Sequence, residues 1–255
     1  QRQMCIRDSP STPGGGALPG GIGWYRKTFT LPETDRDKVI YVDFDGVYRN
    51  SEVWINGHSL GFRPNGYVSF RYDLTPYLRY GSQPNVIAVK ADNSEQPNSR
   101  WYSGSGIYRN VWLVKVNPVH VDNWGTFVHD MKISSEEATF ALEVRIRNSS
   151  EADREAEVST SIYDDRNKVV TASVTTLLRV PYTPCYDTRM REASVDHQFS
   201  IPNPKLWSPD SPSLYTAVTE VKVAGKVVDR YETVFGLRTF RWDCLLYTSD
   251  AADEL

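Results

Sequence analysis

The sequence predicts an all-β protein of two sandwiches in tandem, a jelly roll over residues 10–117 and an immunoglobulin-like β-sandwich over residues 118–238. Short runs rich in β-branched and aromatic residues recur along most of the chain. Glycine and proline separate these runs, and no heptad repeat or long amphipathic helix interrupts them. Pro118 marks the expected boundary between the two sandwiches.

The predicted elements of the first sandwich follow a Gly- and Pro-rich loop at residues 10–23. Strands are expected at residues 24–31, 39–44, 51–55, 86–91 and 110–116. The dipeptide Asn56-Gly57 is the strongest hairpin signal, because a type I′ turn needs positive φ at both central residues.

Two further features of the first sandwich can be predicted. Residues 73–78 are typical of a single helical turn, capped by Asp73 or Thr75. Trp54 and Trp112 lie inside predicted strands, so we expect both indole rings in the core.

The second sandwich is predicted from strand count. Seven strands in about a hundred residues is typical of an immunoglobulin-like sandwich. They are expected at residues 119–128, 138–148, 156–163, 168–177, 194–201, 214–223 and 227–235. Ala224-Gly225 predicts a tight turn between the last two strands.

The two ends of the chain are predicted to be foreign to the protein. Residues 1–9 can be encoded by a nucleotide string whose reverse complement, read in another frame, encodes residues 244–251. Both ends resemble translated adapter from DNA library preparation, so we exclude residues 1–9 and 244–255 from fold reasoning as adapter-derived artefact. The natural chain is then expected to continue on both sides, and the sequence leaves the compartment open between bacterial periplasm and cytoplasm.

Composition excludes several classes of partner. The net charge is −3, and it becomes −1 without the two ends because these carry +1 and −3. A nearly neutral core offers no electrostatic attraction to nucleic acid or to an anionic membrane. No run approaches the ~20 apolar residues of a membrane span. Only Cys185 remains between the excluded ends, so no disulfide is expected there.

Searches for familiar cofactor and catalytic motifs find none. Phosphate loops, dinucleotide fingerprints and the nucleophile elbow are absent from the sequence. The four histidines are scattered singly, and one cysteine does not make a thiolate zinc site. We therefore expect no cofactor and no metal site in this chain.

The most informative segment is the polar stretch at residues 92–109, between two predicted strands. It combines carboxylates, amides and guanidinium groups with Trp101, Tyr102 and Tyr108, and these aromatic residues argue against disorder. Planar polar groups bind pairs of sugar hydroxyls, and an aromatic ring stacks on the apolar face of a pyranose. The residue types fit a sugar site, and they fit equally an ordered loop packed on its own sandwich.

Five segments in order resemble glycoside hydrolase family 2, especially its β-galactosidases. Residues 20–29 resemble the entry to that family's sugar-binding jelly roll, and residues 51–57 resemble its central hairpin. Residues 92–111 resemble the loop and strand that approach the active site. Residues 206–215 are similar to its immunoglobulin-like domain, and residues 235–243 to the segment that leads into the catalytic barrel.

The resemblance implies an N-terminal, non-catalytic fragment of a retaining glycosidase, most similar to β-galactosidase. The jelly roll would be galactose-binding-like and N-terminally truncated. In the family, two barrel glutamates carry the chemistry, roughly 5–5.5 Å apart. The catalytic barrel is absent here, and residues 239–243 would start the linker to it. No catalytic residue is therefore expected, and the fragment alone is predicted to be inactive. β-Glucuronidases and β-mannosidases share the architecture.

The resemblance also implies a substrate-binding role for Asp92, with Asn93, Arg100 and Trp101 beside it. The expected ligand is a β-galactoside or related oligosaccharide, and the expected partner is the missing catalytic barrel of the same chain. No nucleic acid and no membrane is expected, while a homo-oligomer and a metal ion in the full-length enzyme stay open. The alternative is a non-catalytic carbohydrate-binding or structural β-sandwich protein.

Overall fold

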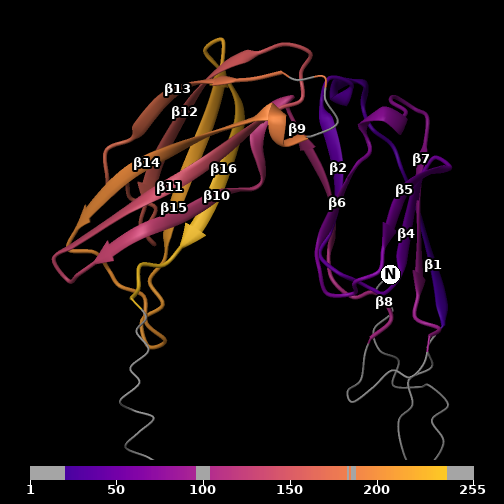
Figure 1. Cartoon of the computed structure of the whole chain (residues 1–255), viewed down its shortest axis with the longest axis horizontal. Coiled ribbons are helices and arrows are strands. Elements are labelled where there is room, and N and C mark those ends of the chain that lie inside the picture. The colour runs from indigo at the N-terminus through magenta and orange to yellow at the C-terminus, as the bar shows by residue number, and fades with distance from the viewer. Residues whose placement is uncertain (1–20, 96–103, 183, 185–187, 240–255) are drawn as a thin grey trace, which may run out of the picture. The chain divides into compact units, whose positions relative to one another are not determined.

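The computed structural model describes residues 21–95, 104–182, 184 and 188–239. These residues divide into two compact units, with the boundary between Pro118 and Val119. Both units are built from antiparallel sheets, and the described residues contain three short 3₁₀ helices and no α-helix (Figure 1). The predicted fold class is confirmed. No helix in the described part of the chain is long and apolar enough to cross a membrane.

The first unit contains a four-stranded sheet, a three-stranded sheet and a two-stranded ribbon. The four-stranded sheet has the order β1 (Ile22–Phe29), β7 (Asn85–Asp92), β4 (Ser51–Ile55), β5 (His58–Arg63). The three-stranded sheet has the order β6 (Phe70–Asp73), β2 (Val39–Phe44), β9 (Val111–Val116). The remaining elements are β3 (Val47–Tyr48), β8 (Gly106–Ile107), η1 (Glu33–Asp35) and η2 (Thr75–Tyr77).

Period-two alternation creates the core of the first unit. Val53 and Ile55 of β4 and Val89 of β7 are buried, whereas the residues between them are only partly buried. Phe44 of β2 faces the same cluster and stacks on Phe70, with the ring centroids 4.9 Å apart. This packing turns one face of each sheet inward and the other face outward.

Several local predictions for this unit are confirmed. Strands β2 and β4 have the predicted bounds. Asn56 and Gly57 have φ values of 50° and 88°, as a type I′ turn requires. The predicted helical turn is η2, and the Thr75 N–H donates to Oδ1 of Asp73 at 2.8 Å.

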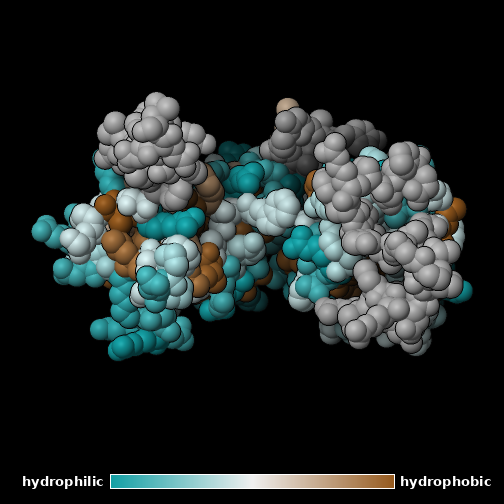
Figure 2. All heavy atoms as spheres, turned by 90° about the horizontal axis from the view of Figure 1, so that it is seen from below, coloured by the Kyte–Doolittle hydropathy of each residue, from teal (hydrophilic) through white to brown (hydrophobic). Residues whose placement is uncertain are grey.

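The prediction that Trp112 belongs to the core is wrong. The residue lies on the edge strand β9, is 55% exposed, and donates from Nε1 to Asp45 Oδ2 at 3.1 Å. Trp54 is partly buried and stacks on Trp24. The indoles of Trp54 and Trp112 lie on outward-facing strand positions. The residue type alone does not show which way a strand residue faces. Figure 2 shows other hydrophobic residues reaching the described surface among hydrophilic ones.

The second unit is a sandwich of seven strands among the described residues. One sheet has the order β10 (Val119–Ile133), β11 (Glu137–Asn148), β14 (Glu192–Pro202). The other has the order β13 (Val174–Val180), β12 (Arg154–Tyr163), β15 (Tyr215–Val223), β16 (Lys226–Phe235). A 3₁₀ helix, η3 (Thr188–Arg191), precedes β14. The predicted strand count is confirmed.

One strand of the second unit begins later than predicted. The predicted strand at residues 168–177 is observed as β13, Val174–Val180. Asp164 Oδ1 accepts the backbone N–H groups of Arg166 and Lys168, which bends the chain into a turn. Val169 keeps only an isolated bridge to Tyr163. The turn chemistry of one aspartate therefore overrides the strand propensity of the residues that follow it.

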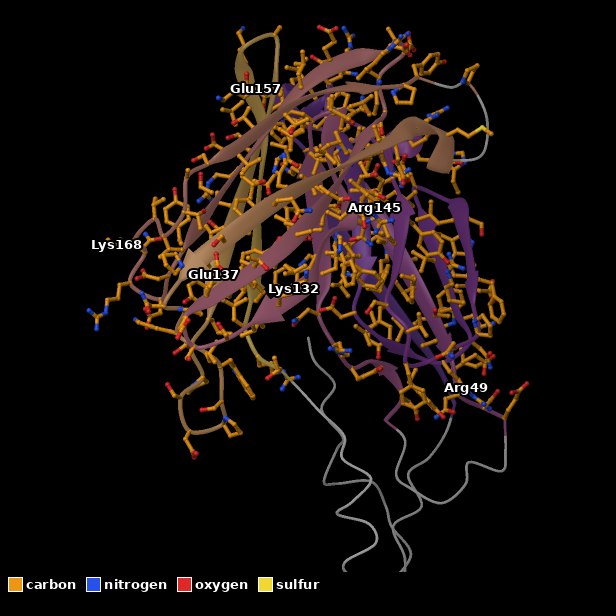
Figure 3. All side chains as sticks on the ribbon, turned by 60° about the vertical axis from the view of Figure 1, so that its left-hand side comes forward. Arg49, Lys132, Glu137, Arg145, Glu157 and Lys168 are labelled. Carbon is orange, nitrogen blue, oxygen red and sulfur yellow. The ribbon has the colours of Figure 1, made fainter. Side chains whose placement is uncertain are left out.

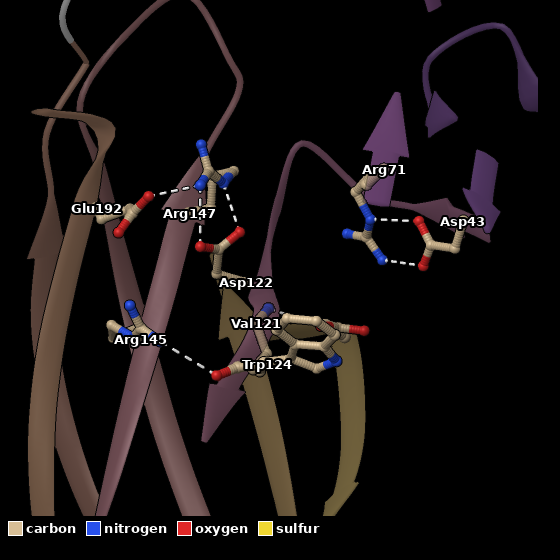
Figure 4. Close-up of polar contacts among 9 residues, drawn as sticks. Asp43, Arg71, Val121, Asp122, Trp124, Arg145, Arg147 and Glu192 are labelled. Carbon is tan, nitrogen blue, oxygen red and sulfur yellow. Dashed lines mark hydrogen bonds and ion pairs between the residues drawn. The ribbon is translucent and has the colours of Figure 1, made fainter. Parts of the chain in front are cut away.

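A cluster of charged residues joins β10, β11 and β14. Arg147 binds both carboxylate oxygens of Asp122, at 2.6 and 2.9 Å, and also donates to Glu192 (Figure 4). The three side chains are 11–17% exposed. Burial alone would raise the pKa of Asp122, but the hydrogen bonds and charge of Arg147 outweigh it and the pKa is lowered. Burial raises the pKa of Glu192 although Arg147 opposes the shift.

Truncation of the second core should be costly. Leu142 of β11 is fully buried, so we expect Leu142→Ala to lower the free energy of unfolding by about 2–5 kcal/mol. Leu177→Ala is the matched control, because Leu177 is 68% exposed, and its effect should stay below about 0.5 kcal/mol. Urea unfolding followed by circular dichroism measures both. Equal losses would contradict the sandwich core.

The charged cluster predicts a pH-dependent effect. Because its folded pKa is lowered, ionised Asp122 stabilises the fold above its unfolded pKa, and this contribution is lost as pH falls. Asp122→Asn should therefore cost about 2 kcal/mol at pH 7, and the difference from wild type should shrink below about pH 4. Glu232→Gln, in the exposed Arg230–Glu232 pair, should cost less than about 1 kcal/mol. A difference that does not change with pH would contradict this account.

Candidate functional site

The candidate site lies where β7 ends, at Asp92. The Asp92 backbone N–H donates to the carbonyl of Arg49 at 2.9 Å, and the Asn50 side chain donates to the carbonyl of Asp92 at 3.3 Å. These contacts join the end of β7 to the residues just before β4. Backbone pairing therefore holds the Asp92 carboxylate at a fixed position on the rim of the first unit.

The Asp92 carboxylate is held ionised. Ser94 donates to Asp92 Oδ1 from its hydroxyl at 2.6 Å and from its backbone N–H at 3.1 Å. The Lys90 ammonium lies 3.7 Å from Oδ2. The hydroxyl and backbone hydrogen bonds from Ser94, followed by the Lys90 charge, lower the pKa of Asp92. A carboxylate in this state accepts hydrogen bonds from sugar hydroxyls and does not act as a general acid.

Asn93 has a different environment from Asp92. It is 2% exposed, its backbone N–H donates to Gly21 at 2.9 Å, and its side-chain amide donates to the Ser105 hydroxyl at 2.8 Å. These contacts link β7 to the segment that leads into β8. Asn93 therefore holds the end of β7 against neighbouring segments, whereas the Asp92 side chain is partly exposed. Arg100 and Trp101 lie outside the described residues.

Arg49 also lies beside Asp92, although no sequence motif indicates this proximity. Its guanidinium donates to Glu95 Oε2 at 3.0 Å, and its carbonyl accepts the Asp92 N–H. Arg49 Nε is buried and has no hydrogen-bond partner among the described residues. Figure 3 labels Arg49 at one end of the first unit. Forty-three positions separate Arg49 from Asp92, so only the pairing of β4 with β7 brings them together.

Aromatic rings lie beside this polar group. Tyr48, which precedes Arg49, packs edge-on against Tyr67 with the ring centroids 5.4 Å apart. Tyr67 is 62% exposed, so it offers a ring to a ligand. Tyr48 pairs with Gly106, which joins β3 to β8. The rim therefore combines an ionised carboxylate, a guanidinium and exposed aromatic surface, which are groups suited to binding a sugar.

The described residues offer no group of three or more His, Cys, Asp or Glu side chains arranged to hold a metal ion. Glu192 has a raised pKa, which is a property of general acids, but its carboxylate is bound by Arg147 within the charged cluster of the second unit.

Comparisons with known proteins agree with this division into units. The profile of the sugar binding domain of glycosyl hydrolases family 2 matches residues 17–117, and that of glycosyl hydrolases family 2 matches residues 119–238. The β-galactosidase BoGH2A of Bacteroides ovatus is 46% identical over 244 residues, which are 93% of this chain and 27% of that protein. A β-glucuronidase of Formosa agariphila is 33% identical, over 86% of this chain and 24% of that protein.

Solved structures give the same result. A glycosyl hydrolase family 2 member from Bacteroides cellulosilyticus DSM 14838 matches with a TM-score of 0.79 and 32% identity, over 89% of this chain and 30% of that chain. A β-glycosidase from Bacteroides vulgatus matches with a TM-score of 0.74 and 39% identity, over 88% of this chain and 27% of that chain. The chain thus spans about a quarter to a third of the proteins it matches here. Both units and their order identify the chain as a member of glycoside hydrolase family 2.

Proposed function

We propose that this chain supplies the substrate-binding and scaffold domains of a retaining glycosidase that hydrolyses β-galactosides. Asp92 binds substrate hydroxyls, Asn93 positions the end of β7, and Arg100 and Trp101 complete the sugar contacts. The two catalytic glutamates lie outside residues 1–255, in a barrel of the same protein.

Long-read sequencing of the source DNA past the codon for Asp243 should find that barrel in frame. A natural stop codon soon after Asp243 would instead favour a non-catalytic carbohydrate-binding protein.

The observation that carries this proposal is the ionised Asp92 carboxylate at the rim of the first unit. Ser94 fixes one of its oxygens, so the carboxylate is oriented before substrate arrives. Oriented acceptors are effective because binding does not have to order them. Support for a galactoside comes from BoGH2A, a β-galactosidase that is 46% identical to this chain.

A β-glucuronide is the second candidate substrate. It is supported by the β-glucuronidase of Formosa agariphila, which is 33% identical to this chain. The ratio of kcat/KM for p-nitrophenyl β-galactoside and β-glucuronide in the intact enzyme separates the two candidates. A ratio above about ten favours the β-galactoside, and a ratio below about one tenth favours the β-glucuronide.

The proposal predicts a kinetic effect for Asp92→Ala in the intact enzyme. Loss of a charge-assisted hydrogen bond should lower kcat/KM about 10- to 100-fold, since such bonds contribute about 1.5–3 kcal/mol. The Tm should change little, because Asp92 is at a strand end and is partly exposed. Asp37→Ala is the matched control, since Asp37 is an exposed aspartate of the same unit. Unchanged kinetics for Asp92→Ala would contradict the assignment.

The proposal also predicts that the 255-residue chain by itself is inactive. Purified chain should hydrolyse neither p-nitrophenyl β-galactoside nor the β-glucuronide above the rate of a buffer blank. The reason is that retaining hydrolysis needs two carboxyl groups on opposite sides of the scissile bond. Hydrolytic activity that coelutes with the chain in gel filtration would refute the proposal that both catalytic glutamates lie outside this chain.

A further inference from the structure

The outward face of the sheet β1-β7-β4-β5 carries a pair of stacked indole rings. Trp24 of β1 and Trp54 of β4 have ring centroids 5.4 Å apart and an interplanar angle of 27°. Trp24 remains 63% exposed. A large aromatic ring left this open on a strand is costly to hydrate, and it presents a flat apolar surface to a ligand.

A groove lies beside these rings. Ala88 of β7 pairs with Arg26 on one side and with Trp54 on the other. The small methyl group of Ala88 therefore lies between the large side chains of Arg26 and Trp54. The groove has a volume of ≈460 Å³, and Trp24, Trp54 and Ala88 are among the residues that line it. This volume lies within the range of small-molecule sites, about 300–1,000 Å³.

Two cationic groups line the same groove. Arg26 lies two residues after Trp24 on β1 and so shares its face, and Arg79 follows η2. Both are exposed, and within the described part of the chain neither guanidinium has a carboxylate or hydrogen-bond partner. The neighbouring Lys90 differs, because it is paired with Glu52 and Asp92. The groove therefore has uncompensated positive charge.

We propose that this groove binds an acidic pyranose, a sugar unit that carries a carboxylate or a sulfate group. The apolar face of the ring stacks on Trp24, and the anion is bound by Arg26 and Arg79. A guanidinium group binds a carboxylate or a sulfate through two parallel hydrogen bonds. The two arginines would therefore select acidic sugars, which aromatic rings alone would not do. Asn56 does not contribute, because its side chain already bonds Tyr77, Asn85 and Val86.

The groove is distinct from the rim at Asp92. Asp92 does not line the groove, and Ala88 precedes it by four residues on β7, about 13 Å along an extended strand, whereas Trp24 pairs with Lys90, two residues before Asp92. The groove would thus bind an acidic polysaccharide away from the residues proposed to contact the cleaved sugar.

The test is isothermal titration of the 255-residue chain with three ligands of one backbone. These are cellotetraose, the same tetrasaccharide with its C6 positions oxidised to carboxylates, and its sulfated form. We expect at least one acidic ligand to bind at least tenfold more tightly than neutral cellotetraose, and the two acidic forms show which anion is preferred. Equal binding of all three ligands, or binding of none, overturns the proposal; the second result would leave the groove as a contact surface for protein.

Matched variants locate the binding. Arg26→Gln should weaken binding of the preferred acidic ligand about tenfold, whereas Lys27→Gln removes the same charge from the opposite face of β1 and should change it less than twofold. Trp24→Ala should also weaken binding, and Trp112→Ala, on the other sheet, should not. Equal losses for Arg26→Gln and Lys27→Gln would indicate diffuse charge attraction and overturn the site. Asp37→Ala, at an exposed aspartate of the same unit that does not line the groove, should leave this affinity unchanged.

Discussion

The register of β7 is the constraint on which both proposed binding surfaces of the first unit depend. This strand pairs with β1 on one side and with β4 on the other. Val89 and Ala91 face the core, so Ala88, Lys90 and Asp92 face outward. A shift of one residue would exchange the two faces, burying the carboxylate and exposing the core. The hydrophobic pattern of β7 therefore fixes both the floor of the groove and the end of the strand at Asp92.

Charged residues in the two units are used in different ways. In the second unit, Arg147 lies between two carboxylates, so the charges compensate one another within the fold. In the first unit, Asp43 and Arg71 form a similar bidentate pair at 2.6 Å (Figure 4). Arg26 and Arg79 have no such partner among the described residues. Internally paired charges stabilise the fold, whereas unpaired exposed charges next to aromatic rings are available for binding.

Much of the fold could be predicted from local sequence. Asn56-Gly57 specified its hairpin because few residues adopt positive φ, and the bounds of β2 could be predicted because only Asp43 interrupts its run of apolar residues. The start of β13 was wrong because the Asp164 side chain competes with the strand for backbone N–H groups. Trp112 was misplaced because residue type does not show which face of an edge strand is covered.

The candidate site was less predictable than the fold. Asp92 is a candidate only through a resemblance, and its contacts with Ser94 are local in sequence. The positions of Arg49 and Tyr67 near the rim could not be predicted, because they depend on strand pairing and ring contacts between distant positions. The Trp24–Trp54 pair was missed for the same reason, since β7 lies between the two strands that carry the rings.

The central claim is that the rim at Asp92 forms part of a glycosidase's sugar site. The most direct test is a crystal structure of the intact protein with a bound, non-hydrolysable β-galactoside analogue. Our account predicts a distance of about 2.6–3.2 Å between an Asp92 carboxylate oxygen and a sugar hydroxyl. A bound sugar that makes no contact with Asp92, directly or through one water molecule, would contradict it.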